Sequence, residues 1–250
     1  FVRVSSPFLR NAHVYELEGQ ESIGALFEHA ISLTCDAAGF DERLIIGHPI
    51  SVVFELAGHD VRTVHGIVSM VRELDEELPG DRLACALTVV PRAWWLGLRV
   101  TSEAFVNQSI PEILATKLAR AGFSPDQDFQ LRLTDEYPSE IVLQYAESDL
   151  DFCARLCEHV GISYFFEHRE RDVIVFTDAN AGFPSRVEPL PFRPPNGARG
   201  VGRIEGTVRG LPSRFTVRDY NYRTPTVRLD ADAEIAASGR GQLQEFGDHV

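Results

Sequence analysis

The sequence predicts an α+β protein that is mostly β, in which a small antiparallel β-barrel lobe precedes an α+β lobe. Three observations support this fold class. Apolar and polar residues alternate in consecutive segments of the first 90 residues, and short turn signals separate these segments, as in antiparallel sheets. Two segments with helical periodicity follow between residues 109 and 161. A hairpin pattern comes directly after the second of them.

The barrel-like lobe is assigned to residues 1–100. Its first clear strand is FEHAISLTC, residues 27–35, in which apolar and polar residues alternate and His29 falls on the apolar side. The stretch ISVVFELAGHDVRTVHGIVSMV then predicts two strands joined by a turn at residues 57–60. Residues 82–91 predict a third strand. Consecutive strands with short turns favour a small barrel or sandwich over a parallel sheet.

The α+β lobe is assigned to residues 101–182, and its first helix is SIPEILATKLARAG. Ser109 and Glu112 have the spacing of a capping box, and Gly122 ends the run. The apolar residues of one helical face are Ile110, Ile113, Leu114, Leu118 and Ala121. The pattern predicts an amphipathic helix that packs against a core.

The segment ESDLDFCARLCEHVGISYFFEH predicts a second helix followed by a β-hairpin. Ser148 can cap the helix, because Asp151 stands three residues later in place of the usual Glu, and Gly161 ends the run. The apolar face comprises Phe152, Cys153, Leu156, Cys157 and Val160. Residues 162–168 and 172–178 then predict two strands that flank a charged turn.

The cysteines of the second helix raise the question of a metal site. Cys153, Cys157 and His159 are of the residue types that bind structural zinc. On a helix, however, the two cysteines share the apolar face, and His159 projects about 200° away from Cys157. No second cysteine pair supplies the remaining ligands. We therefore expect no metal and no other cofactor.

Acidic residues around the same helix raise the question of catalysis. They are Glu147, Asp149, Asp151 and Glu158. Two facing carboxylates could form an acid/base pair of the glycosidase kind. Three of the four, however, crowd the helix N-terminus, where capping and the helix dipole stabilise carboxylates. The sequence also lacks the nucleophile-elbow, zinc-protease and phosphate-loop motifs, so we expect no catalytic residues.

A proline-rich segment follows the α+β lobe. Residues 183–200 contain five prolines, a composition typical of an extended arm or linker. Residues 201–250 are assigned to further strands, of which one alternating strand starts at Arg214 and is interrupted at Pro225. The last 20 residues are predicted to have little regular structure.

The net charge of the chain argues against some classes of binding partner. The formal net charge is −13, from 37 acidic and 24 basic residues, so binding to nucleic acid is not expected. Lys117 is the only lysine, and the remaining cations are arginines, which suit bidentate pairing with carboxylates at interfaces. We find no run of about 18 apolar residues and no Sec-type signal peptide.

The segment that ends at His168 resembles the signature of the VgrG spike proteins of bacterial type VI secretion systems, which are related to the baseplate hub of contractile-tailed phages. The structural motif that carries the resemblance comprises Glu147, Ser148, Asp149, Asp151, Phe152, Arg155, Leu156, Gly161 and Phe165. Further matches, such as GHP at 47–49 and SIPEI at 109–113, keep the family order over residues 20–225. The chain departs from the family pattern at Cys153, Cys157 and His159.

The resemblance implies a phage-baseplate-hub-like fold and a structural hub rather than an enzyme. Such a hub forms a homotrimer, docks on the ring protein of the inner tube, and carries effector and spike-tip proteins through regions beyond this chain. It is made in the bacterial cytoplasm, assembled in the secretion apparatus and exported without a Sec signal. Two alternatives stay open: the baseplate hub of a contractile phage or prophage tail, and an enzyme with an unrecognised active site.

Overall fold

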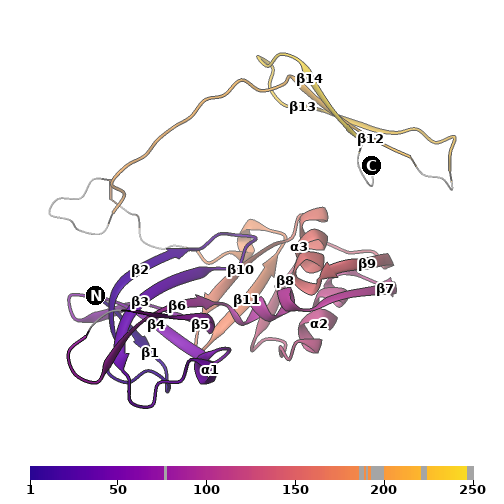
Figure 1. Cartoon of the computed structure of the whole chain (residues 1–250). Coiled ribbons are helices and arrows are strands. Elements are labelled where there is room, and N and C mark those ends of the chain that lie inside the picture. Colours follow the sequence, from indigo (N-terminus) through magenta and orange to yellow (C-terminus); the bar gives the residue numbers. More distant parts are fainter. Residues whose placement is uncertain (76–77, 186–188, 190, 193–199, 221–223, 247–250) are drawn as a thin grey trace. The chain divides into compact units, whose positions relative to one another are not determined.

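Figure 1 shows the computed structural model of the chain. The residues that it describes are 1–75, 78–185, 189, 191–192, 200–220 and 224–246. The chain divides into two compact units, residues 1–185 and residues 186–250. Strands predominate over helices, so the predicted fold class, α+β and mostly β, is confirmed.

A curled, half-barrel sheet of six strands forms the first lobe of unit 1 (Figure 1). The strands are β1 (Val2–Ser5), β2 (His13–Gln20), β3 (Glu28–Asp36), β4 (Pro49–Leu56), β5 (His59–Leu74) and β6 (Arg82–Val90). Their order in the sheet is β1-β4-β5-β6-β3-β2, and all neighbours are antiparallel. A short helix, α1 (Glu42–Ile45), lies between β3 and β4 in the chain.

Side-chain alternation along β3 builds the core of this lobe. Leu33 and Cys35 are wholly buried, Ile31 is 1% exposed and His29 is 3% exposed. The predicted strand and the inward direction of His29 are therefore confirmed. Residues of β4, β5 and β6 complete the apolar core from the neighbouring strands.

The turn between β4 and β5 is shorter than the sequence predicts. Ala57 and Gly58 have φ angles of 52° and 81°, the conformation that a two-residue hairpin turn requires. His59 already belongs to β5. Strand β2 was not predicted, because a bulge between Val14 and Glu16 breaks its side-chain alternation.

The second lobe of unit 1 contains two sheets and a helix pair. Its elements are η1 (Arg92–Leu98), β7 (Val100–Gln108), α2 (Ile110–Arg120), β8 (Phe129–Arg132), β9 (Glu140–Ser148), α3 (Asp149–His159), β10 (Ser163–His168), β11 (Asp172–Thr177) and η2 (Asn180–Gly182). One sheet is the two-stranded ribbon β7–β9, and the other has the order β10-β11-β8. Both predicted helices and the predicted hairpin β10–β11 are confirmed. Strands β7, β8 and β9 were not predicted from the sequence.

Local signals fix both ends of α2. The amide N–H of Ser109 donates to a carboxylate oxygen of Glu112 at 2.7 Å, and the Ser109 hydroxyl donates to the same oxygen at 2.8 Å. The predicted capping box is confirmed. Gly122, with φ of 87°, follows the last turn in the left-handed conformation that favours glycine.

Unit 2 contains a three-stranded sheet with the order β13-β12-β14. Its strands are β12 (Arg214–Asp219), β13 (Leu229–Glu234) and β14 (Gln242–Phe246). The prediction of a single interrupted strand from Arg214 is wrong, since β12 and β13 are separate antiparallel strands with Pro225 in their connection. The expectation of little regular structure near the C-terminus is also wrong, because pairing with β12 orders the polar strand β14.

Most of the predicted arm, residues 183–200, lies outside the described residues. The helices that are described lack the length and apolar character needed to cross a membrane.

Candidate functional site

The motif that carries the family resemblance forms the start of α3. Ser148 is the N-cap residue, and its hydroxyl oxygen accepts a hydrogen bond from the amide N–H of Asp151 at 3.0 Å. The same hydroxyl donates to Oδ2 of Asp151 at 2.6 Å. The cap that the sequence predicts is therefore confirmed. Gly161, with φ of 73°, follows the last turn of the helix.

A buried ion pair lies directly behind this cap. Nζ of Lys117, on α2, is 2.8 Å from Oδ1 of Asp149, in the first turn of α3. The Lys117 side chain is fully buried, and that of Asp149 is 1% exposed. Lys117 also lies 3.2 Å from Oε2 of Glu103, on β7. One cation thus connects a strand and two helices.

Asp149 accepts further hydrogen bonds from the strands β7 and β9. Oδ1 accepts from Nε2 of Gln144 at 3.0 Å and from the hydroxyl of Thr101 at 3.2 Å. Burial alone raises the pKa of this carboxyl group, but the hydrogen bonds from Lys117 and Gln144 outweigh burial and hold the pKa below its ordinary value. Asp149 is therefore a buried carboxylate that its partners keep ionised.

The position of Lys117 was missed in the sequence analysis, although a signal was present. Lys117 follows Ile113 and Leu114 at helical spacings of four and three residues. Both of these apolar side chains are wholly buried. A lysine on an apolar face needs a buried acidic partner, since an unpaired buried charge is costly. The spacing could not show which acidic residue is the partner of Lys117.

Aromatic rings enclose the ion pair. Phe105 and Phe152 stack with ring centroids 5.5 Å apart, and Nζ of Lys117 lies 5.3 Å and 5.5 Å from the two centroids. Leu156 and Ile113 complete this small core. The predicted inward placement of Phe152 and Leu156 is confirmed. Each of these four side chains is at most 4% exposed.

Arg155 pairs with Glu147 at the surface of the same region. Its Nη2 lies 2.6 Å from Oε1 of Glu147 and 3.1 Å from the carbonyl oxygen of Leu143. Hydrogen bonding to Arg155 lowers the pKa of Glu147. These contacts tie α3 to the strand β9 that precedes it.

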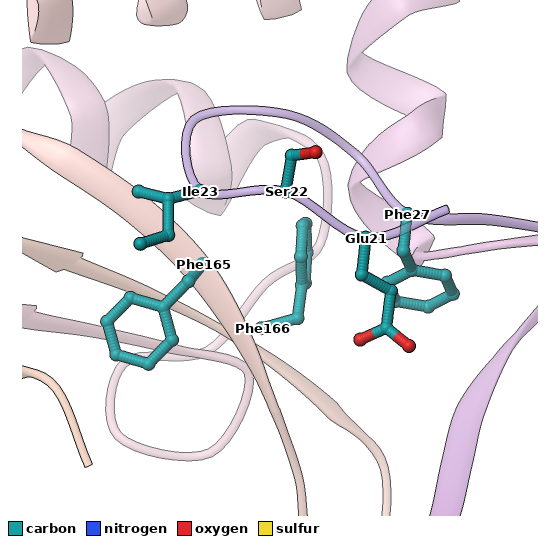
Figure 2. Close-up of a pocket in the computed structure, with 6 residues that line it drawn as sticks. All are labelled: Glu21, Ser22, Ile23, Phe27, Phe165 and Phe166. Carbon is teal, nitrogen blue, oxygen red and sulfur yellow. The ribbon is translucent and has the colours of Figure 1, made fainter. Parts of the chain in front are cut away.

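Phe165, the last member of the motif, lies on β10 and packs with Val173, Val175 and Phe183. It also borders a cavity of about 210 Å³ with Phe166, Phe27 and the loop that follows β2, as Figure 2 shows. Phe27 and Phe166 meet edge to face, with centroids 5.3 Å apart. This contact joins the half-barrel to the second lobe through aromatic packing.

A hydrogen bond between two histidines also connects the half-barrel to the second lobe. The amide N–H of His65, on β5, donates to Nδ1 of His168, on β10, at 3.1 Å. Burial lowers the pKa of His168 to about 4, so the ring is neutral and can accept this hydrogen bond. Within the second lobe, Arg92 of η1 pairs with two acids, because its Nε and Nη1 lie 2.6 Å and 2.9 Å from carboxylate oxygens of Asp172 and Asp128.

The cysteines of α3 have the environment of core residues. Burial raises the pKa of Cys153 and of Cys157 to about 12, which disfavours the thiolate form that binds zinc. The described part of the chain contains no group of three potential metal ligands.

The arrangement around Asp149 offers no access to a substrate. Asp149 and Lys117 neutralise each other's charge, and both side chains are buried. Groups of this kind hold elements in place and cannot exchange protons with a dissolved reactant. Of the other acids, Glu147 pairs with Arg155, and Asp151 bonds the capping hydroxyl of Ser148. The geometry therefore favours a structural motif.

Comparison with known proteins identifies the family. The family described as phage tail baseplate hub (GPD) matches residues 20–249. The chain belongs to this family. Among curated relatives of the hub region, the type VI secretion system spike protein VgrG1a of Pseudomonas aeruginosa PAO1 is 31% identical over 228 residues, which cover 88% of this chain and 35% of that protein. The resemblance to VgrG spike proteins is thus confirmed.

Two further relatives show the range of proteins that carry this hub region. The actin cross-linking toxin VgrG1 of Vibrio cholerae serotype O1 is 32% identical over 66% of this chain and 15% of its own length. The solved structure of the E. coli c3393 protein, described as a type VI secretion component similar to the T4 tail proteins gp27 and gp5, matches with a TM-score of 0.67. It is 26% identical, and the match covers 78% of this chain and 53% of c3393. The chain spans about one third of the length of VgrG1a.

Proposed function

We propose that the chain acts as a structural hub in the spike complex of a type VI secretion system, where it trimerises and docks on the inner tube for effector delivery. The observation that carries this proposal is the hub-family match over residues 20–249, together with 31% identity to a spike protein. The closed cluster around Lys117 and Asp149 supports a structural role, because its charges only connect elements of the fold.

The proposal assigns no enzymatic activity to this chain. The toxin relative matches over only 15% of its own length, so its printed activity need not belong to the shared region. Within the described residues, the buried acid and base of the motif neutralise each other. We expect purified chain to lack hydrolase activity toward glycosides, the class for which paired carboxylates would be suited.

The proposed partners follow from this role. They are further copies of the chain and the ring protein of the inner tube, while effector and spike-tip proteins use the parts that longer relatives carry. Nucleic acid is not a partner, because the net charge of −13 repels phosphates. The chain is made in the bacterial cytoplasm, assembles in the secretion apparatus and leaves the cell without a Sec signal.

Sedimentation tests the proposal directly. Sedimentation velocity across a range of micromolar concentrations should show a trimer, and the chain should cosediment with assembled rings of the tube protein from the same secretion system. A chain that stays monomeric at every concentration and does not bind the rings would overturn the proposed function.

A second candidate function is the baseplate hub of a contractile phage or prophage tail. The description of the matching family, a phage tail baseplate hub, favours it. Neighbouring genes separate the two candidates. Sheath, tube and ATPase genes without capsid genes would indicate secretion, whereas capsid and portal genes would indicate a phage tail.

A further inference from the structure

Unit 2 contains a cavity of about 660 Å³. Its lining residues come from two segments, 209–212 and 236–243, and the second segment connects β13 to β14. The amide N–H of Arg240 donates to the carbonyl oxygen of Leu211 at 3.3 Å. A Cβ atom at Gly239 would lie only 2.7 Å from the same oxygen, so the two segments approach as closely as glycine allows. Backbone contacts thus hold the two walls of the cavity together.

Each segment contributes one arginine to the cavity. Arg209 and Arg240 are exposed, and within the described residues neither side chain has an acidic partner. Arg203 of the same unit, by contrast, pairs with Glu205. No acidic residue of the described chain lines the cavity. The cavity is therefore a basic site in a chain whose net charge is −13.

An open strand edge and two leucines adjoin these arginines. Gln242 and Leu243, the first residues of β14, also line the cavity. In the part of the chain that the structure describes, β14 pairs with β12 alone, so its other edge presents main-chain groups that no strand uses. Leu211 and Leu243 are 53% and 46% exposed. Extended peptides bind sites of this kind, because a strand edge offers main-chain hydrogen bonds and the adjoining side chains provide selectivity.

We propose that this cavity binds an extended acidic segment of a partner protein. Carboxylates of the segment pair with Arg209 and Arg240, since planar guanidinium groups suit bidentate bonds to carboxylates. The main chain of the segment adds to the edge of β14, and its apolar side chains contact Leu211 and Leu243. A small inorganic anion uses the guanidinium groups alone and leaves the strand edge and the leucines without a partner. The combination of groups consequently favours a peptide.

Fluorescence anisotropy of a labelled hexapeptide in which glutamate alternates with valine tests this proposal. The purified chain should bind this probe, and replacing the glutamates by glutamines should weaken binding by at least about tenfold, because the charge-assisted hydrogen bonds are lost. Methylation of the backbone amides of the peptide removes the donors of strand pairing and should also weaken binding. Both comparisons use the unaltered chain, so they do not depend on the folding of a variant.

Three variants of the chain test the two arginines. Arg209→Gln and Arg240→Gln should each weaken binding of the glutamate peptide about tenfold. Arg203→Gln is the matched control, because it removes the same charge from unit 2 outside the cavity, and it should leave binding unchanged. Circular dichroism checks that each variant keeps its strands.

The outcomes distinguish a peptide site from general attraction between charges. Weaker binding by both cavity variants, with normal binding by the Arg203→Gln control, supports the site. Equal weakening by all three variants overturns it, since binding would then follow the total charge of the chain. Binding that backbone methylation leaves unchanged, or pyrophosphate that binds as tightly as the peptide, overturns the peptide as occupant. A chain that does not bind the glutamate peptide also overturns the proposal, whatever its oligomeric state.

Discussion

Nζ of Lys117 lies 2.8 Å from Oδ1 of Asp149, although 32 residues separate them in the chain. The pair joins α2 to the first turn of α3, and neither side chain has appreciable contact with water. A pair of this kind contributes little by its presence, because desolvation offsets the attraction. Replacing only one partner of the pair is costly, since the charge of the other partner stays buried. The stability of the second lobe therefore depends on keeping both partners.

The first prediction concerns this pair. Lys117→Met should lower the free energy of unfolding by about 3–5 kcal/mol, because Asp149 then loses its buried cation and keeps only the half-exposed Arg99, whose Nε lies 3.5 Å from Oδ2. Asp149→Asn should also destabilise the chain. The double variant should lose less than the sum of the two single losses, since it leaves no uncompensated charge. Chemical denaturation of all four chains measures the coupling, and strictly additive losses would contradict it.

The second prediction compares packing with capping in α3. Leu156 is 4% exposed in the core with Phe105 and Phe152, so Leu156→Ala should cost about 2–5 kcal/mol. Ser148→Ala removes the acceptor for the Asp151 amide and should cost only about 0.5–2 kcal/mol. Urea denaturation of both variants provides the comparison. Equal losses would count against the assigned roles.

The third prediction concerns acid sensitivity at the contact between lobes. His168 has an ordinary pKa of 6.5 that burial lowers to about 4, with smaller lowering from Arg62 and His65 and opposing effects of Glu21 and Asp172. The unfolded chain thus binds more protons between these pH values, so stability falls as pH decreases from about 6.5 to about 4. The loss attributable to His168 is at most about 3 kcal/mol.

His168→Asn is the matched variant for this prediction. The asparagine Oδ1 can take the place of Nδ1 and accept the hydrogen bond from the His65 amide, but it does not titrate. Urea denaturation at several pH values should show a flatter profile between pH 6.5 and 4 for the variant. An unchanged profile would show that His168 is not the group responsible.

The fourth prediction concerns metal content. Cys153 and Cys157 have a raised pKa of about 12 because they are buried, so neither provides a thiolate near neutral pH. Elemental analysis of the purified chain should find no stoichiometric zinc, and a chelator should leave the unfolding midpoint unchanged. One zinc per chain would contradict the prediction.

Local sequence patterns predicted those strands and helices whose ends and buried faces are determined by neighbouring residues in the chain. The alternation around Leu33 and the capping signals at Ser109 and Ser148 each correspond to an observed strand or helix start. The motif helix was placed correctly because its cap, apolar face and terminal Gly161 agree. In such segments, intrinsic preference and tertiary packing point to the same structure.

Elements that depend on distant partners were not predictable in this way. Strand β9 is ordered by pairing with β7, and no local signal connects them. Asp149 was correctly placed in the first helical turn, but its pairing with Lys117 depends on how two helices meet. The exposure of Leu143 and Tyr145 is likewise a tertiary property. A spacing rule cannot reveal any of these relationships.

Lys117 carries the only lysine amine of the chain, and the native fold encloses it completely. Acylating reagents can therefore reach it only after α2 and α3 separate. Within residues 1–250, no other side chain carries a primary amine that would compete for such a reagent. The rate at which mass spectrometry detects acylation at this residue consequently reports local opening of the helix pair, without any engineered label.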